Sequence, residues 1–454
     1  MTATNDHGER SPRLVWHAGR VVTSPPRFWP WVVLLGLVGQ VAWAVENMYL
    51  NVYVYDTITD SPTVLAALVA ASAVAATLAT MLAGAASDRR GRRRPFIAGG
   101  YILWGLSTAA FGWVGTDTVG ALAPAGQAVA VAVVAIIALD CVMSAFGATA
   151  NDAAFQAWVT DSTTQTNRGR VDGVLMTMPL LAMLIVFGAL DPLTRAGEWR
   201  TFFLLVGGVT TLVGVVALVG LRESPRPTPS GGYLSSVLHG LRPSTVRESP
   251  RLYLTLVAWL VVATSAQVFL PFLIIYVQRF LRIDGYALVL AVVLVGAAVV
   301  SVFGGRLLDR VGADRGVLPA AALYVVALLL MVPARGMAAV MLAGVVAMGG
   351  MLLATAALSA TVRNLTPTDR AGQVQGLRMI FVVLVPMVLG PFVGAAVIAG
   401  ADETYVDLGV VRQVPSPWIF LAAAVVVLLV VVPMHLLRRH GPVARPEETQ
   451  EVHP

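Results

Sequence analysis

Two acidic residues lie inside long apolar segments of the sequence, Glu46 within residues 29–55 and Asp140 within residues 126–158. A charged side chain in the hydrocarbon of a membrane is costly and is therefore a candidate for function. At 1.5 Å per helical residue, Glu46 lies roughly 25 Å from the inner end of its helix, and Asp140 roughly 20 Å from the outer end of its helix. The two carboxylates are thus expected at similar depth. Both cannot stay charged in a cavity of low dielectric without a cation or proton between them, so we interpret them as an ion-coupling site.

A polar stripe borders Glu46 on the same predicted helix. Gln40, Trp43, Asn47 and Asn51 follow the i, i+3, i+7, i+11 spacing of one helix face. Amides and an indole ring on an otherwise apolar helix are typical of the wall of a substrate cavity. A second interpretation is that the amides only bond neighbouring helices and that Glu46 lies in water near the outer interface.

The predicted fourth helix carries a similar stripe. Its members are Asp140, Ser144, Gly147 and Asn151, with Asp152 beside them. We interpret these residues as further coupling and substrate ligands, and Gln267 as a ligand from the second half of the chain. The alternative is that each acid bonds a neighbouring hydroxyl group or arginine and is structural. Arg378, the nearest basic side chain, is expected to reach the headgroups instead.

The composition places these stripes in a membrane protein. Of 454 residues, 57% are hydrophobic and 12% are charged, with a mean hydropathy of +0.77, whereas a soluble domain is usually about 25% charged. The arginines lie in short turns rather than in one basic domain, which argues against a nucleic-acid partner. The only cysteine, Cys141, excludes an internal disulfide and a cysteine metal site.

The chemistry of an enzyme is not indicated. We find no metal-ligand cluster, no Walker loop and no Ser-His-Asp candidate, so no metal or cofactor is expected apart from a coupling proton or sodium ion. Residues 1–28 carry charges but no apolar core before Phe28, and we expect an uncleaved N-terminus.

Twelve apolar segments are long enough to cross a bilayer as helices. They predict an all-α membrane protein of two six-helix bundles with both termini in the cytoplasm. The segments are 29–55, 63–86, 95–115, 126–158, 171–190, 200–221, 251–278, 285–305, 316–334, 337–362, 373–400 and 415–437. The expected domains are an N-terminal tail (1–28), a first bundle (29–221), a central cytoplasmic loop (222–250), a second bundle (251–437) and a C-terminal tail (438–454).

The distribution of arginine predicts the orientation. With the N-terminus inside, only six of the 31 basic residues fall in outer loops: Arg195, Arg200, Arg279, Arg282, Arg335 and Arg412. Positive charge concentrates on the cytoplasmic side of membrane proteins. We therefore expect a multi-pass protein of the plasma (inner) membrane, in contact with the bilayer and monomeric.

A charged turn occurs twice at one constant offset. Gly84, Asp88, Arg89, Gly91 and Arg94 find counterparts in Gly305, Asp309, Arg310, Gly312 and Arg315. A second pair, GRVDG at 169–173 and GQVQG at 372–376, follows the fourth segment of each half. These repeats predict two related halves.

With this paired turn, the six-plus-six pattern and the run Glu223-Ser224-Pro225-Arg226, the chain resembles the major facilitator superfamily. Its long fourth segment, from Asn151-Asp152 to Asp161, is most similar to the glycoside–pentoside–hexuronide:cation symporters. The resemblance implies that Asp88 forms ion pairs with Arg89 and Arg92 that hold the halves together on the cytoplasmic side. Asp161 and Glu223 are the expected partners of that cluster. The alternative is that these arginines only follow the positive-inside rule.

We therefore expect a secondary active transporter that works by alternating access on a small-molecule substrate. Subgroup resemblance favours cation-coupled import of a sugar or glycoside. A proton-coupled exporter of drugs or lipophilic compounds is the first alternative, with Glu46 as its carboxylate. A receptor or scaffold without transport is the second, although it would need neither the paired turn nor the buried acids.

Overall fold

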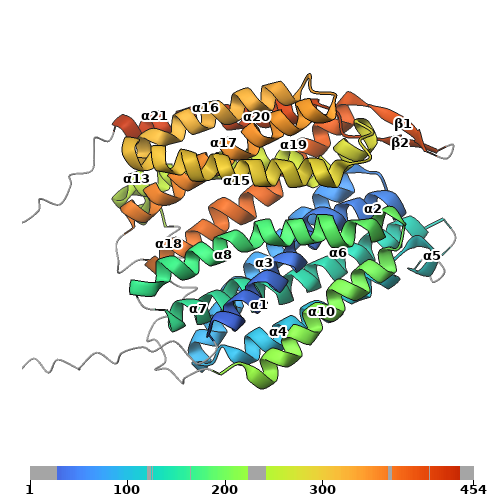
Figure 1. Cartoon of the computed structure of the whole chain (residues 1–454), viewed down its shortest axis with the longest axis horizontal. Helices are drawn as coiled ribbons and strands as arrows, with labels where there is room; N and C mark the ends of the chain where they lie inside the picture. Colours follow the sequence, from blue (N-terminus) through green and yellow to red (C-terminus); the bar gives the residue numbers. More distant parts are fainter. Residues whose placement is uncertain are drawn as a thin grey trace, which may run out of the picture.

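The computed structural model describes residues 28–119, 124, 126–163, 165–222, 242–366, 371–407 and 410–439. The chain forms two bundles of helices that run along the long axis of the molecule. Helices of the first half, blue to green, lie beside those of the second half, yellow to red (Figure 1). The predicted helical membrane architecture is confirmed, with one small hairpin added.

The first bundle is built from residues 28–220, and most of its spans are composite. In chain order its elements are α1 (Phe28–Ala44), η1 (Val45–Leu50), α2 (Asn51–Thr57), α3 (Pro62–Arg90), α4 (Arg94–Ala110), η2 (Phe111–Trp113), α5 (Thr116–Val119), α6 (Ala128–Gly147), η4 (Ala148–Phe155), α7 (Gln156–Ser162), α8 (Gln165–Ile185), η5 (Val186–Leu190), α9 (Asp191–Arg195) and α10 (Trp199–Gly220).

The second bundle follows the short helix α12 (Pro243–Glu248). Its elements are α13 (Pro250–Phe269), η6 (Leu270–Phe272), α14 (Leu273–Ile275), η7 (Tyr276–Phe280), α15 (Tyr286–Val311), α16 (Ala313–Met331), α17 (Met337–Leu365), α18 (Ala371–Arg378), η9 (Met379–Leu384), α19 (Val385–Ala401), β1 (Thr404–Asp407), β2 (Val410–Gln413), α20 (Trp418–Leu428) and α21 (Val431–Arg439).

Eleven helices within the described residues are long and apolar enough to cross a membrane. The predicted span 95–115 corresponds to α4, whose 17 residues end in the 3₁₀ turn η2. Tyr101 and Trp104 of α4 are fully buried, and α4 packs against α10 and α6. The count of twelve membrane-crossing helices therefore stays a prediction.

Five spans contain π-helical turns that the sequence pattern did not predict: η1, η4, η5, η7 and η9. A π turn closes hydrogen bonds between residues i and i+5 and often marks a functional site. Glu46 and Asn47 lie in η1, and Asn151 and Asp152 lie in η4. The candidate residues therefore lie at distortions of their helices.

The two halves meet along two pairs of helices. α3 packs against α19 and η9, and α15 packs against α8 and η5. Within the first half, α4 approaches α10 closely because Gly105 and Gly207 face each other, and an added Cβ on either would collide with backbone of the other helix. Small residues at helix crossings are typical of membrane bundles.

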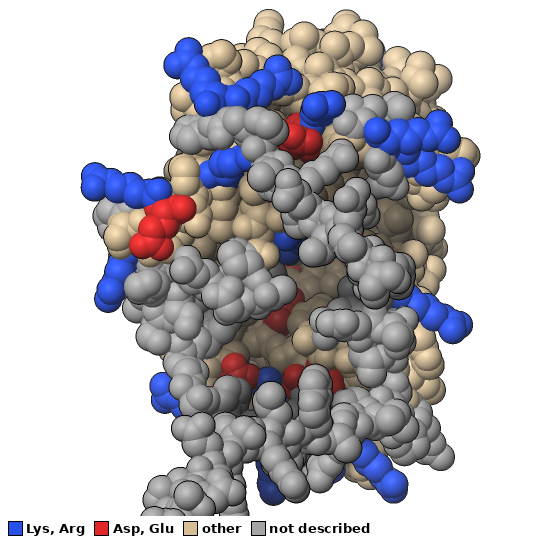
Figure 2. Space-filling view, turned by 90° about the vertical axis from the view of Figure 1, so that its left-hand side faces the viewer, with Lys and Arg blue, Asp and Glu red and all other residues tan. Residues whose placement is uncertain are grey.

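The two ends of the molecule differ. One end carries the antiparallel hairpin β1–β2, in which Thr404 pairs with Gln413, and we name it the hairpin end (Figure 1). The opposite end carries the turn Asp88–Arg94, and we name it the arginine-rich end. Figure 2 shows this second end, with basic side chains around its rim and a hollow containing acidic side chains between the halves.

Candidate functional site

Glu46 and Ser144 connect the first and fourth spans in the interior of the first half. The Ser144 hydroxyl group donates a hydrogen bond of 2.5 Å to Glu46 Oε1. Both side chains are buried, with 7% of Glu46 and none of Ser144 exposed. Among the described residues, the second oxygen of Glu46 is buried without a hydrogen-bond partner. The structure thus places Glu46 in the protein interior and not in water at an interface.

Asp140 and Asp152 complete a group that we name the acid cluster, which comprises Glu46, Asp140 and Asp152. Asp140 is 1% exposed, and its Oδ1 atom is buried without a partner in the described part of the chain. Glu46 lies within electrostatic range of both aspartates. Ser72 of α3 interacts with Asp140, and Trp43 interacts with Asp152. Three spans therefore meet at three carboxyl groups.

The acid cluster can exchange protons but cannot carry three negative charges in this environment. Burial disfavours the charged form of each carboxyl group, and each neighbouring charge adds to that cost. The hydrogen bond from Ser144 also fits the structural interpretation, in which a hydroxyl group satisfies the acid, but it leaves one oxygen each on Glu46 and Asp140 unsatisfied.

The predicted stripe on the first helix is only partly correct. Asn47 is exposed to the central cavity, but Asn51 is 1% exposed and donates a hydrogen bond of 3.1 Å to the carbonyl oxygen of Asn47. The helical spacing fails because η1 inserts a π turn between Glu46 and Asn51. Gln40 and Trp43 are half-buried, and the Trp43 ring packs against Trp104 at a centroid distance of 5.1 Å.

The stripe Asp140, Ser144, Gly147 and Asn151 on the fourth span is buried. Asp140 belongs to the acid cluster, and Ser144 donates a hydrogen bond to Glu46 of that cluster. Asn151 donates a hydrogen bond of 2.7 Å to the Tyr101 hydroxyl group, which in turn donates one of 2.6 Å to the carbonyl oxygen of Leu35. These bonds join the first, third and fourth spans. Asn151 therefore connects helices in this structure, and its assignment as a substrate ligand stays a prediction.

A central cavity of about 340 Å³ lies between the two halves. Its wall on the first half is formed by Asn47, Met48, Val69, Met183 and Phe187. Gln267 lies on the opposite wall, as the sequence analysis expected, together with apolar residues that include Leu270, Leu290, Leu294 and Met348. This volume is within the usual range of small-molecule sites. Asn47 and Gln267 are the polar side chains among its lining residues.

At the arginine-rich end, Arg93 is the centre of the charged turn. It forms an ion pair with Asp88 and a second one with Asp161, whose Oδ2 atom lies 3.2 Å from Arg93 Nε. Arg93 also donates a hydrogen bond of 2.6 Å to Ser87. Asp161 is thus the partner that was expected. The basic residue is Arg93, whereas the expected Arg89 and Arg92 are exposed.

The backbone of the turn repeats in the second half. Gly91 ends α3 with a φ of 61°, and Gly312 follows α15 with a φ of 96°. Both angles favour glycine, which explains why the second glycine of the turn recurs. Gly84 and Gly305 have open space around them, and Arg310 is exposed. Glu223, Arg226 and the side chain of Asp309 lie outside the described residues.

A buried group at the hairpin end was missed by the sequence analysis. Asp191 is 2% exposed and forms an ion pair of 2.6 Å with Arg195. Tyr49 donates a hydrogen bond of 3.0 Å to the same carboxyl group, and Tyr286 of the second half donates another. Asp191 ends an apolar segment four residues before Arg195, and that spacing was the available signal.

Further polar contacts at this end cross between the halves. Arg279 pairs with Asp56 at 2.8 Å, and the Tyr55 hydroxyl group donates a hydrogen bond of 2.5 Å to the carbonyl oxygen of Gln413. The backbone amide of Gln413 donates one of 2.8 Å to Asp60. The hairpin β1–β2 is thus attached to the first half.

This architecture, two helical bundles around a central cavity, is that of a multi-pass membrane protein. The family model of the Major Facilitator Superfamily matches residues 32–382, and again residues 261–453. The chain belongs to this superfamily. No protein of curated function matches its sequence.

Solved transporter structures share the fold at low sequence identity. One is a bacterial homolog of the human lysosomal transporter Spinster in an inward-facing, unoccupied conformation, with a TM-score of 0.67 and 16% identity over 92% of this chain and 98% of that chain. A variant of the nucleoside transporter NupG has a TM-score of 0.67 and 12% sequence identity, over 90% of this chain and 99% of that chain. An auto-inhibited peptide transporter of the POT family has a TM-score of 0.68 and 14% sequence identity, over 93% of this chain and 98% of that chain.

Proposed function

We propose that this chain is a proton-coupled secondary transporter of a neutral, largely apolar small molecule. The observation that carries the proposal is the pair Glu46 and Asp140 of the acid cluster, both buried in the first half, in a protein whose central cavity has a mostly apolar wall. A carboxyl group inside a membrane bundle is typical of a proton relay. This choice corresponds to the lipophilic-substrate alternative of the sequence analysis.

The proton is favoured over sodium as the coupling ion by the geometry of the acids. Burial disfavours a charged carboxyl group, and uptake of a proton removes that charge. The oxygens on Glu46 and Asp140 that have no partner among the described residues are suited to binding one proton each. Protonation would remove the charge before the cavity changes the side to which it is open.

The contacts at the two ends support an alternating-access cycle in the plasma membrane. Asp56, Asp60 and Asp191 bind the second half at the hairpin end, while Figure 2 shows a hollow at the arginine-rich end. We assign the arginine-rich end, with both termini, to the cytoplasm because positive charge concentrates on that side. In this assignment the structure represents a state open to the cytoplasm, and the Arg93 ion pairs rearrange when the cavity opens outward.

Cation-coupled uptake of a sugar or glycoside is the second candidate. It is supported by the amides of Asn47 and Gln267, which line the central cavity from opposite halves and suit the hydroxyl groups of a glycoside. The apolar remainder of the wall favours the first proposal, since hydroxyl groups of a free sugar would face methyl groups there.

Proteoliposomes with an imposed pH gradient test both candidates. A panel of labelled hexoses, aryl glycosides and lipophilic dyes would be followed into wild-type and Asp140→Asn vesicles, with a sodium gradient in parallel. We expect gradient-driven movement of an apolar compound that is abolished by Asp140→Asn. Glu403→Gln, which neutralises an exposed acid at the hairpin end, is the matched control and should transport normally. Accumulation that does not depend on the pH gradient would overturn proton coupling through this cluster. Accumulation that persists in the Asp140→Asn variant would overturn it as well.

A further inference from the structure

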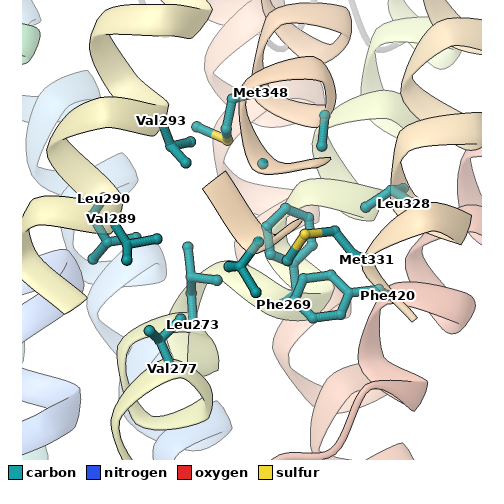
Figure 3. Close-up of a pocket in the computed structure, with 13 residues that line it drawn as sticks. Phe269, Leu273, Val277, Val289, Leu290, Val293, Leu328, Met331, Met348 and Phe420 are labelled. Carbon is teal, nitrogen blue, oxygen red and sulfur yellow. The ribbon is translucent and has the colours of Figure 1, made fainter. Parts of the chain in front are cut away.

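The second half contains a narrow apolar pocket of about 30 Å³ that the transport argument has not used. Figure 3 shows how its side chains converge: Met331 and the rings of Phe269 and Phe420 form one wall, and Val289 and Leu290 face them. Every lining residue is apolar. A space of this size has room for a water molecule but offers it no polar partner, so it favours hydrocarbon.

This pocket adjoins the central cavity. Leu273, Leu290, Val293 and Met348 line both spaces and therefore separate them. In Figure 3, Val293 and Met348 lie at one edge of the pocket, and Leu273 lies at another. An apolar group of a molecule in the cavity would reach the pocket when these four side chains shift. Met348 and Met331 are flexible side chains that adapt to the shape of such a group.

The polar groups of the combined space are confined to the cavity. Asn47 comes from η1 of the first half and Gln267 from α13 of the second half, and both offer amide donors and acceptors. The lining of the two spaces includes no charged side chain. The two spaces thus combine a neutral hydrogen-bonding region with an adjoining apolar region.

We propose that the ligand of this transporter is a neutral amphiphile, with a head that hydrogen-bonds Asn47 and Gln267 and an alkyl chain that enters the pocket beside Met331 and Phe420. This inference rests on the proposed function in one respect, that the central cavity is the substrate site. It adds the chemical class of the substrate. Each methylene that leaves water for the pocket should tighten binding about fourfold, until the pocket is filled.

Binding measurements on the full chain in lipid nanodiscs test this without any transport step. Two homologous series would be titrated calorimetrically, n-alkyl glucosides from methyl to hexyl and 1-alkanols from ethanol to octanol. We expect affinity in at least one series to rise about fourfold per carbon for the one or two carbons that the pocket holds, and then to level off. An affinity that is independent of chain length, or no binding by any member of either series, would overturn the proposal.

Two substitutions locate the alkyl chain. Ala347→Leu fills the pocket from α17, since Ala347 is 5% exposed and lines it, and should abolish the gain with chain length. Met331→Ala enlarges the pocket and should move the plateau two or three carbons further. Leu330→Ala, at a 53% exposed neighbour on the same helix, is the control and should behave as wild type.

The shortest member of the binding series and the thermal unfolding temperature report whether each variant is folded. An Ala347→Leu protein that unfolds normally yet keeps the full gain with chain length would place the alkyl chain elsewhere and overturn the proposal. Chain-length-dependent binding without pH-driven transport would instead leave the pocket in place and reject proton coupling. Failure of the inference and failure of the proposed function are therefore distinguishable.

Discussion

Tyr286, the first residue of α15, donates a hydrogen bond to the carboxyl group of Asp191 at the end of the fifth span, and this bond joins the two halves of the molecule. The guanidinium group of Arg195 binds Asp191 as well, and its Cζ atom lies 4.7 Å from the centroid of the Tyr286 ring. A buried carboxylate thus holds two residues of its own half, Tyr49 and Arg195, and one of the other, Tyr286.

Tyr286→Phe should weaken the contact between the halves at the hairpin end. A hydrogen bond to a charged group contributes about 1.5–3 kcal/mol, so the population separated at that end should rise at least about tenfold. The measurement is the distance between spin labels on Ala196 and Glu403, both exposed, in a Cys141→Ala background. Tyr324→Phe is the control, because the Tyr324 hydroxyl group accepts a hydrogen bond from Ser265 within the second half. An unchanged distance distribution would contradict the prediction.

Glu46→Gln should separate exchange from accumulation. The amide keeps an oxygen that accepts the hydrogen bond from Ser144, so the helices should stay packed and substrate exchange should continue. The amide cannot release a proton, so accumulation against a gradient should fall to background. Counterflow and pH-driven uptake in the same vesicles measure the two properties. Loss of both, with normal unfolding, would show that Glu46 serves binding and not coupling.

Ser144→Ala should cost stability at the acid cluster. The substitution leaves Glu46 with two unsatisfied buried oxygens in place of one, which costs about 1–3 kcal/mol. Thermal unfolding in nanodiscs measures the loss. Ser107→Ala is the matched control, since the Ser107 hydroxyl group bonds carbonyl oxygens of its own helix only in the contacts described, and its cost should be smaller. Equal losses of stability in the two variants would show that the hydrogen bond from Ser144 to Glu46 contributes no more than a bond within one helix.

Arg93→Ala should slow the transport cycle, and Arg92→Ala should not. Arg93 connects Asp88 at the end of α3 to Asp161 at the end of the fourth span, whereas Arg92 is exposed. Removing one partner leaves two carboxylates that repel each other, and we expect about a tenfold fall in turnover. Initial rates of uptake at saturating substrate provide the measurement. A charge exchange, Arg93→Asp with Asp161→Arg, should restore part of the rate if the pair acts in the cycle.

Much of the fold could be predicted because each apolar segment is long and nearly free of charge, as in α17 and α10. The repeated turn was recognisable because Gly91 and Gly312 adopt positive φ angles that few other residues tolerate. The hairpin β1–β2 could not be predicted, since its strands have four residues each and are held to the first half by Asp60 and Tyr55, far away in sequence.

The relative positions of candidate residues could be predicted where both residues lie on one regular α-helix. Asp140 and Ser144 lie on one uninterrupted α6, and the structure brings both to Glu46. The prediction failed at Asn51, because a π turn rotates the helix after Glu46 and leaves no mark in the composition. Asp191 was missed because its partner Tyr286 lies 95 residues further along the chain.

The fourth span has 35 residues, from Ala128 to Ser162, and at 1.5 Å per residue it is about 50 Å long, against about 30 Å of hydrocarbon. Ser144 attaches this long span to Glu46 near its middle, and Asp161 lies near its end, where it pairs with Arg93. The arm between them is about 25 Å long. A tilt of about 10° around Ser144 therefore moves the tip by about 4 Å, which is the limiting separation of an ion pair. If the span keeps its shape through η4, we expect it to act as a lever, so that a small rearrangement at Ser144 makes or breaks the Asp161 contact at the membrane surface.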